Sequence, residues 1–233
     1  MPYFYYGFDS TYFLVLIGVV LSLLASSRVK STYAKYSRES SLTGMTGAQA
    51  AHRILTMAGI YDVTIQHVSG NLTDHYDPRN KTLNLSDSVY GNSSVAAVGV
   101  AAHECGHAIQ HDRGYVPLKL RSAIAPVANF GAKISWPLIF IGLLFGGSGT
   151  LVQLGILMFS LAVAFQLITL PVEYNASNRA MNMLEETGIL YREELSKTKK
   201  VLNAAALTYV AAAASSILQL LRLVLLFGNR RRD

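Results

Sequence analysis

The chain has 233 residues, a formal net charge of +6, 51% hydrophobic residues and only 15% charged residues, whereas soluble domains carry about 25% charged residues. This deficit of charge indicates a membrane protein, and the apolar content excludes an intrinsically disordered chain. The length excludes a large multidomain assembly. Cys105 is the only cysteine, which excludes an intramolecular disulfide and a cysteine-based metal cluster within the chain.

Four apolar runs occupy residues 12–25, 134–147, 151–170 and 204–221. Only the third has the roughly 20 residues that a hydrocarbon core requires, so the first two must draw on flanking residues. One short run alone would suit a buried core helix, but four in so short a chain favour membrane spans. We therefore predict a mainly α integral membrane protein with three to four transmembrane helices and a small α+β domain built from the polar remainder.

The basic residues predict the orientation in the membrane. Residues 1–11 contain no Lys or Arg, whereas ten basic residues follow the first run from Arg28 to Arg121, which is the reverse of a signal peptide. By the positive-inside rule, the N-terminus lies outside and the polar domain lies in the cytoplasm. The aromatic residues at positions 3–12 then form an outer interfacial belt, and the uncharged residues 146–150 form an outer hairpin. We expect a multi-pass protein of the cytoplasmic membrane.

One feature disagrees with this topology. We expect the fourth run to cross the membrane, but crossing places Arg230, Arg231 and Arg232 outside and Arg222 near the end of the span. The other basic residues gather where an anionic cytoplasmic leaflet would attract them, so they require no nucleic acid partner.

The predicted division of the chain follows these runs. We expect an N-terminal anchor over 1–27, a cytoplasmic domain over 28–126, a transmembrane hairpin over 127–170, a second cytoplasmic segment over 171–202, and a C-terminal membrane helix with a basic tail over 203–233.

Within the polar domain, the pattern predicts a helix over 46–58 capped by Thr46, and strands over 63–68 and 82–86 in a small antiparallel sheet. Strand 82–86 is expected at an edge, where an extended peptide could pair with it. A further helix is expected from residue 93 to 111, capped by Asn92 or Ser93.

That last helix carries the strongest motif in the chain, His103-Glu104-Cys105-Gly106-His107. Histidines four residues apart share one face of a helix, so His103 and His107 can bind the same Zn²⁺ ion. Glu104 lies beside them and can take a proton from a water molecule at the metal, whose charge lowers the pKa of that water towards about 7.

A catalytic zinc site requires a third protein ligand. His111 stands in line with the pair along the same helix, so the three cannot converge on one ion. Glu173 is the better candidate, because it follows the third apolar run directly and the uncharged hairpin returns it to the side of the histidine helix.

The segments AAHECGHAIQH and LPVEYNASNRA, separated by two apolar runs and preceded by one, resemble the YugP-like bacterial membrane zinc metallopeptidases over nearly the whole chain. The plan is also similar to that of the HtpX and CAAX prenyl protease group. The resemblance implies zinc, with His103, His107 and Glu173 as ligands and Glu104 as base. That group usually has Asp four residues after the glutamate, where this chain has Ser177. Serine accepts such a hydrogen bond only weakly, so Asn175, Asn178 or another group is expected to orient His103.

The group that stabilises the oxyanion is left open by the sequence. Arg179 lies on the same expected helix as Glu173, and His75 and Tyr76 precede a turn. Each is a candidate for the donor that the reaction needs beside the metal.

These observations predict a membrane-anchored zinc endopeptidase that cleaves proteins or peptides in or near the membrane, with its active site facing the cytoplasm. Its partners would be the lipid bilayer, its substrates, and a membrane-protein partner or a second copy of the chain. A site inside the bilayer is disfavoured, because only about ten apolar residues precede His103 and Asp112-Arg113 follow soon after. A catalytically silent membrane scaffold with a structural metal is the alternative, although such a site has no use for Glu104.

Overall fold

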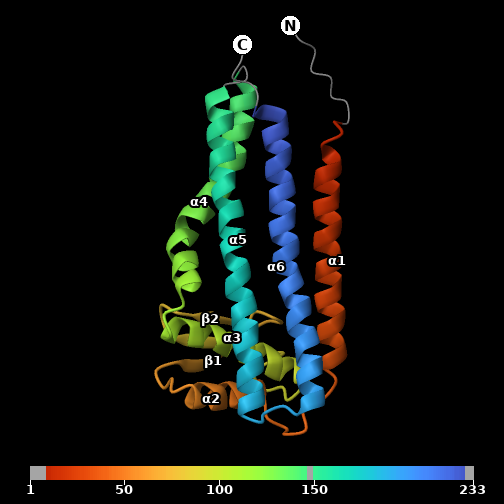
Figure 1. Cartoon of the computed structure of the whole chain (residues 1–233), viewed down its shortest axis with the longest axis vertical. Helices are drawn as coiled ribbons and strands as arrows, with labels where there is room; N and C mark the ends of the chain where they lie inside the picture. Colours follow the sequence, from red (N-terminus) through yellow and green to blue (C-terminus); the bar gives the residue numbers. More distant parts are fainter. Residues whose placement is uncertain (1–8, 146–148, 229–233) are drawn as a thin grey trace. The chain divides into compact units, whose positions relative to one another are not determined.

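The computed structural model describes residues 9–145 and 149–228. The chain divides into two compact units. The span unit comprises Met1–Ala25, Arg121–Ile168 and Thr208–Asp233, and the polar unit comprises Ser26–Leu120 and Thr169–Leu207. The elements shown in Figure 1 are α1 (Tyr12–Tyr36), α2 (Gly47–Met57), β1 (Thr64–Val68), β2 (His75–Asp77), β3 (Thr82–Ser86), α3 (Val95–Asp112), α4 (Val116–Leu144), α5 (Gly149–Glu186) and α6 (Arg192–Phe227).

Helices α1, α4, α5 and α6 are long and apolar enough to cross a membrane. Helices α1, α5 and α6 contain the first, third and fourth predicted runs, and α4 contains residues 134–144 of the second, so the predicted mainly α membrane protein with a small α+β part is confirmed. The predicted outer hairpin at 146–150, the aromatic belt before residue 9 and the arginines at 230–232 lie wholly or mostly outside the described residues.

Small residues allow the helices of the span unit to pack closely. A Cβ atom at Gly155 of α5 would lie 2.8 Å from the carbonyl oxygen of Ser135 in α4, so only glycine permits this approach. Helices in lipid associate through such close backbone contacts, because burial of apolar surface gives no advantage there.

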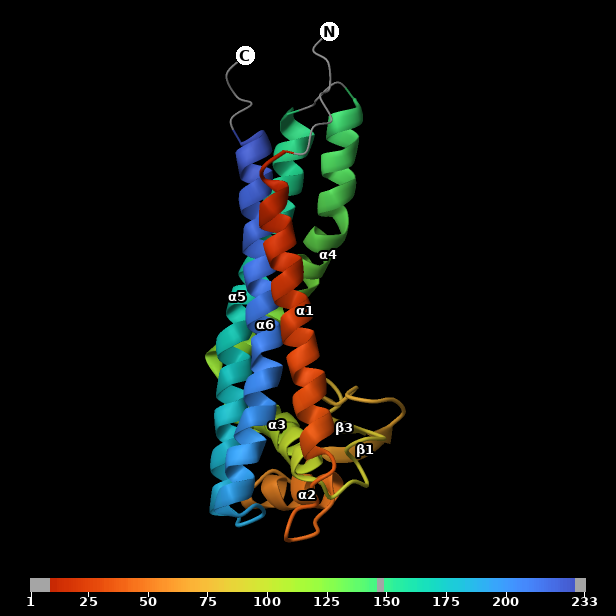
Figure 2. The same ribbon diagram turned by 90° about the vertical axis from the view of Figure 1, so that its right-hand side faces the viewer.

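In the same unit, α1 and α6 run antiparallel and side by side (Figures 1 and 2). The Oγ atoms of Ser22 and Ser215 lie 3.0 Å apart, and Ser215 Oγ donates to the carbonyl oxygen of Gly18. Nearer the end of α6, the guanidinium carbon of Arg222 lies 4.1 Å from the centre of the Tyr12 ring. Arg222, which disagreed with the predicted topology, therefore has its charge over an aromatic face, and such a face stabilises a cation.

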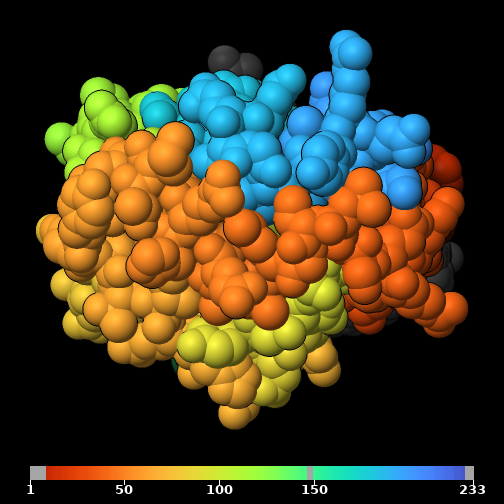
Figure 3. All heavy atoms as spheres, turned by 90° about the horizontal axis from the view of Figure 1, so that it is seen from below, coloured from red at the N-terminus to blue at the C-terminus, as the bar shows by residue number. Residues whose placement is uncertain are grey.

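In the polar unit, α2 begins as its sequence predicts. Gln49 N donates to the Thr46 side chain, and Thr46 N donates to the Gln49 side chain, which is a complete capping box. Figure 3 shows a face of this unit on which α2, in orange, lies beside the segment that joins α5 to α6, in light blue. Arg53 of α2 donates to the carbonyl oxygen of Thr187 there.

The sheet differs from the prediction. Its strand order is β1-β3-β2, with β1 parallel to β3 and β2 antiparallel to β3. The prediction of an all-antiparallel sheet with residues 82–86 at an edge was therefore wrong, because β3 is the central strand and its Leu83 and Leu85 are fully buried. The two edge strands are β1 and β2.

Helix α3 is enclosed within the polar unit. Its first eight residues are all Ala, Val or Gly, and 14 residues of the helix are buried, as expected of a helix whose first half is apolar on all sides. The cap is Ser94, which accepts from Ala97 N, rather than the predicted Asn92 or Ser93, and Asn92 accepts from Ser94 N. The core around α3 is formed by α2, the sheet and residues of α5 and α6.

Candidate metal centre

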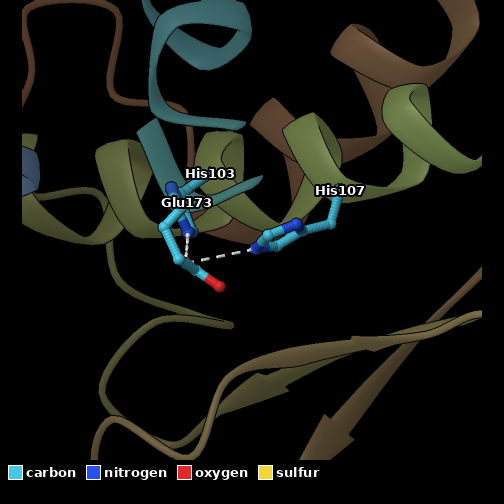
Figure 4. Close-up of side chains that lie close together, drawn as sticks. All are labelled: His103, His107 and Glu173. Carbon is cyan, nitrogen blue, oxygen red and sulfur yellow. Dashed lines mark hydrogen bonds and ion pairs between the residues drawn. The ribbon is translucent and has the colours of Figure 1, made fainter. Parts of the chain in front are cut away.

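Three side chains converge at the middle of α3. His103 and His107 project from one face of this helix towards Glu173 of α5 (Figure 4). The Nε2 atoms of His103 and His107 lie 3.3 and 3.5 Å from the same Glu173 oxygen, Oε2. One donor atom from each residue lies within 4.8 Å of the others, so the three could hold a single ion.

Gly106 allows α3 to meet α5 at this point. A Cβ atom there would lie 2.4 Å from the carbonyl oxygen of Ala176, an atom of the α5 backbone. Since a backbone atom cannot rotate away, any larger residue must push the two helices apart. The glycine inside the HExxH motif thus brings the histidine pair within reach of Glu173.

We therefore expect Gly106→Ala to weaken both the fold and the site. Overpacking of this kind costs about 1–3 kcal/mol, and the separation of α3 from α5 lowers the affinity for zinc. Thermal unfolding and zinc titration of the detergent-purified protein measure the two effects. The matched control is Gly91→Ala, because a Cβ atom at Gly91 would meet nothing within 4 Å. Equal zinc affinity in both variants would contradict this explanation of Gly106.

Each histidine uses its two ring nitrogens differently. Both Nε2 atoms face Glu173, whereas His103 Nδ1 lies 3.1 Å from Ser177 Oγ and His107 Nδ1 lies 3.0 Å from Gln110 Oε1. A hydrogen bond donated from Nδ1 leaves the lone pair on Nε2, which is the arrangement that a metal ligand requires. Ser177 therefore contacts His103 at the position where the resembling group has Asp, and Asn178 is exposed.

Gln110 was not among the predicted site residues, although it is fully buried beside the site. Its Nε2 donates to the carbonyl oxygen of Val172 and to Asn175 Oδ1. These two bonds fix the orientation of the amide, so Oε1 must face His107 and accept from it. Gln110 lies three residues after His107, and this spacing on one helix face was the available signal.

We expect Gln110→Leu to lower zinc affinity about 10- to 100-fold, the usual effect of removing a group that orients a metal-bound histidine. Leucine fills the space but cannot accept the Nδ1 proton. Competition with a chromogenic chelator measures the affinity, and the exposed Gln66→Leu is the control. Unchanged affinity in Gln110→Leu would show that another contact fixes the imidazole.

Glu104 lies beside the histidines and is mostly buried. Its Oε2 accepts a hydrogen bond of 3.0 Å from the backbone N–H of Tyr76 in β2. The Tyr76 hydroxyl lies 2.9 Å from His111 Nδ1, and burial raises the pKa of this phenol to about 12, so it stays protonated and donates. His111 is thus bonded to Tyr76, consistent with its exclusion as a ligand.

Two other candidates are held by different partners. Arg179 Nε donates to Asn175 Oδ1, and its guanidinium lies over the Tyr115 ring at 5.9 Å. Asn175 therefore joins Arg179 to Gln110. His75 is exposed, with Nδ1 2.9 Å from the carbonyl oxygen of Thr73 and Nε2 3.2 Å from the Asn84 amide. The structure gives neither Arg179 nor His75 a contact with the histidine pair in the described parts of the chain.

The donor set fits zinc. Two imidazoles and one carboxylate leave a fourth tetrahedral position open, as in catalytic rather than structural zinc sites. Cys105 lies inside the motif but belongs to the core, because burial raises the pKa of its thiol well above the usual value and Sγ contacts the carbonyl oxygen of Ala51. It is not a ligand.

Comparison with known proteins identifies the family of the chain. The chain belongs to a family of zinc metallopeptidases, since the family model described as "Putative neutral zinc metallopeptidase" matches residues 11–228. The chain is 49% identical over 221 residues to the "Putative membrane protease YugP" of Bacillus subtilis (strain 168). These residues make up 95% of this chain and 98% of that protein. The resemblance stated from the sequence is confirmed, and no solved structure matches.

Proposed function

We propose that this chain is a membrane-anchored zinc endopeptidase that hydrolyses peptide bonds in membrane or membrane-proximal proteins. The observation that carries the proposal is the convergence of His103, His107 and Glu173, with the carboxylate of Glu104 on the adjacent residue of α3. A structural metal site has no need for such a carboxylate, and its fourth position is filled by protein.

Each residue has a separate role in the proposed reaction. Zinc held by His103, His107 and Glu173 would act as a Lewis acid and lower the pKa of water at the site towards about 7. Glu104 takes a proton from the attacking water and passes it to the leaving amine, as a general base and then a general acid. Its bond from Tyr76 N holds the carboxylate in place for both transfers.

The substrates are proposed from the position of Glu173. This residue lies three positions past the apolar run 151–170 on the same helix, so a peptide at the site would be close to the bilayer surface. The name of the Bacillus subtilis relative, "Putative membrane protease YugP", agrees with this proposal. The partition of basic residues further supports the cytoplasmic membrane with the site facing the cytoplasm; a membrane-protein partner or a second copy stays a prediction.

The outward edge of β2 is the proposed place for an extended substrate. In the antiparallel pairing of β2 with β3, Tyr76 stands opposite Leu83, but its N–H donates to Glu104 rather than to β3. The main chain of Tyr76 therefore faces α3. An extended peptide that pairs with this edge would gain main-chain hydrogen bonds beside the base, with little demand on its side chains.

The test is metal-dependent cleavage by the purified protein in detergent. We expect about one zinc per chain, internal cleavage of an unfolded substrate such as casein, loss of cleavage on chelation and recovery on zinc addition. Mass spectrometry of the fragments separates internal cuts from trimming at the ends. Stoichiometric zinc without cleavage of casein or of a membrane-protein substrate would instead support the silent scaffold.

A further inference from the structure

A second site lies in the polar unit, in a groove of about 400 Å³ between α1 and α6. Its residues recur at helical spacing on both walls, so each helix presents one continuous face to the groove. The lining residues are Arg28, Ser31, Thr32, Lys35 and Tyr36 of α1, and Lys200, Asn203, Ala204 and Leu207 of α6.

The groove is cationic. Arg28, Lys35 and Lys200 line it, and within residues 9–145 and 149–228 no carboxylate does so. Glu39 is the acidic residue nearest in sequence to the α1 wall of the groove. It forms an ion pair with Lys197, whose Nζ lies 2.6 Å from Glu39 Oε2. In the described chain, none of the three cations of the groove forms an ion pair, so all three are available to an anion.

The α6 wall of the groove changes from polar to apolar along its length, from Lys200 to Leu207. Ser31, Thr32 and Asn203 add hydroxyl and amide groups that can bind phosphate or glycerol oxygens, whereas Ala204 and Leu207 are apolar. These two residues already belong to the fourth apolar run, 204–221. A ligand that fills the groove therefore requires a charged part and an apolar part.

The groove residues also lie close in sequence to the ends of two apolar runs. Arg28 follows the end of the first apolar run, residues 12–25, by three residues, and Lys200 precedes the start of the fourth run by four. Lys and Arg at this position meet the headgroups of anionic lipids, and basic pockets between transmembrane helices bind them specifically.

We propose that the groove binds the phosphate headgroup of an anionic phospholipid. Arg28 presents a planar fork suited to two phosphate oxygens, while the two lysines act as point charges. The glycerol backbone meets Asn203 and Thr32, and the first part of an acyl chain lies along Leu207. A free phosphate compound shares the headgroup chemistry but lacks the acyl chain, so the lipid is the favoured source.

The experiment compares two double variants of equal charge. Lys35→Gln with Lys200→Gln removes one lining lysine from each helix, and Lys30→Gln with Lys199→Gln removes one exposed lysine outside the lining from each of the same helices. Native mass spectrometry measures retention of phosphatidylglycerol and of phosphatidylcholine by the full chain released from detergent. Glycerol phosphate is added as the soluble competitor, and bound zinc and helix content report folding.

We expect the wild type and the Lys30/Lys199 variant to retain phosphatidylglycerol over phosphatidylcholine, and the Lys35/Lys200 variant to bind phosphatidylglycerol on the order of tenfold more weakly. Equal retention by both double variants would overturn the site, and displacement of the lipid by an equimolar amount of glycerol phosphate would overturn the lipid as its source. If the Lys35/Lys200 variant loses its helix content, Lys35→Gln and Lys200→Gln are measured singly. Retention of phosphatidylglycerol by both at the level of Lys30→Gln and Lys199→Gln would likewise overturn the site. Proteolysis is not needed for any readout, so failure here leaves the proposed function intact.

Discussion

Glu104→Gln is expected to bind zinc as the wild type does while cleaving peptides about 10²–10⁴-fold more slowly, the range that general acid–base catalysis contributes. Glutamine has the shape of glutamate, and its amide oxygen can still accept the hydrogen bond from Tyr76 N. It cannot take a proton from water. Activity and metal binding should therefore separate in this variant.

The measurement pairs zinc content with initial rates on the same preparation. Glu193→Gln makes the same chemical change at an exposed position in the first turn of α6, so it should match the wild type in both. Cleavage by Glu104→Gln at the rate of Glu193→Gln would remove Glu104 from the role of base. Loss of zinc would indicate that the carboxylate is needed to build the site.

Glu173→Ala should lose zinc altogether at concentrations that saturate the wild type. The substitution leaves two imidazoles, and the loss of a direct donor should exceed the roughly 10- to 100-fold cost of losing a group that only orients a ligand. It also leaves a buried space between α3 and α5, since the Glu173 side chain is only 3% exposed.

Zinc affinity from chelator competition and helix content from circular dichroism distinguish loss of the ligand from loss of the fold. Glu186→Ala alters the same residue type at an exposed position near the end of the same helix, and should retain full affinity. Full zinc occupancy in Glu173→Ala would place the third ligand elsewhere. Glu173→Gln, which conserves volume, should lower affinity without the packing defect.

Much of the fold could be predicted because its signals are local. The apolar runs locate the spans, the Thr46 and Gln49 capping box begins α2, and the spacing of His103 and His107 on a helix places them on one face. The pairing with Glu173 came from its position directly after a span and from the resemblance. The structure brings these three side chains together.

The remaining features depend on contacts between distant segments. The direction of β1 relative to β3 depends on the path that the chain takes from one strand to the other. The alternation of apolar and polar residues over 82–86 is the same in a central strand and in an edge strand. Gln110 resembles any polar helical residue until Val172 and Asn175, more than sixty positions away, fix its amide. Gly106 shows its importance only when the backbone of α5 is placed against it.

The contact between α3 and α5 has a thermodynamic consequence. His103 and Glu173 are 70 residues apart in sequence, so an ion held by both would close a long loop that the unfolded chain leaves open. Binding to the folded state alone adds RT ln(1 + [Zn]/Kd) to its stability, about 4 kcal/mol at a thousandfold excess over Kd. The proposed metal would then crosslink α3 and α5 as well as take part in catalysis. The free energy of unfolding would rise with the free zinc concentration.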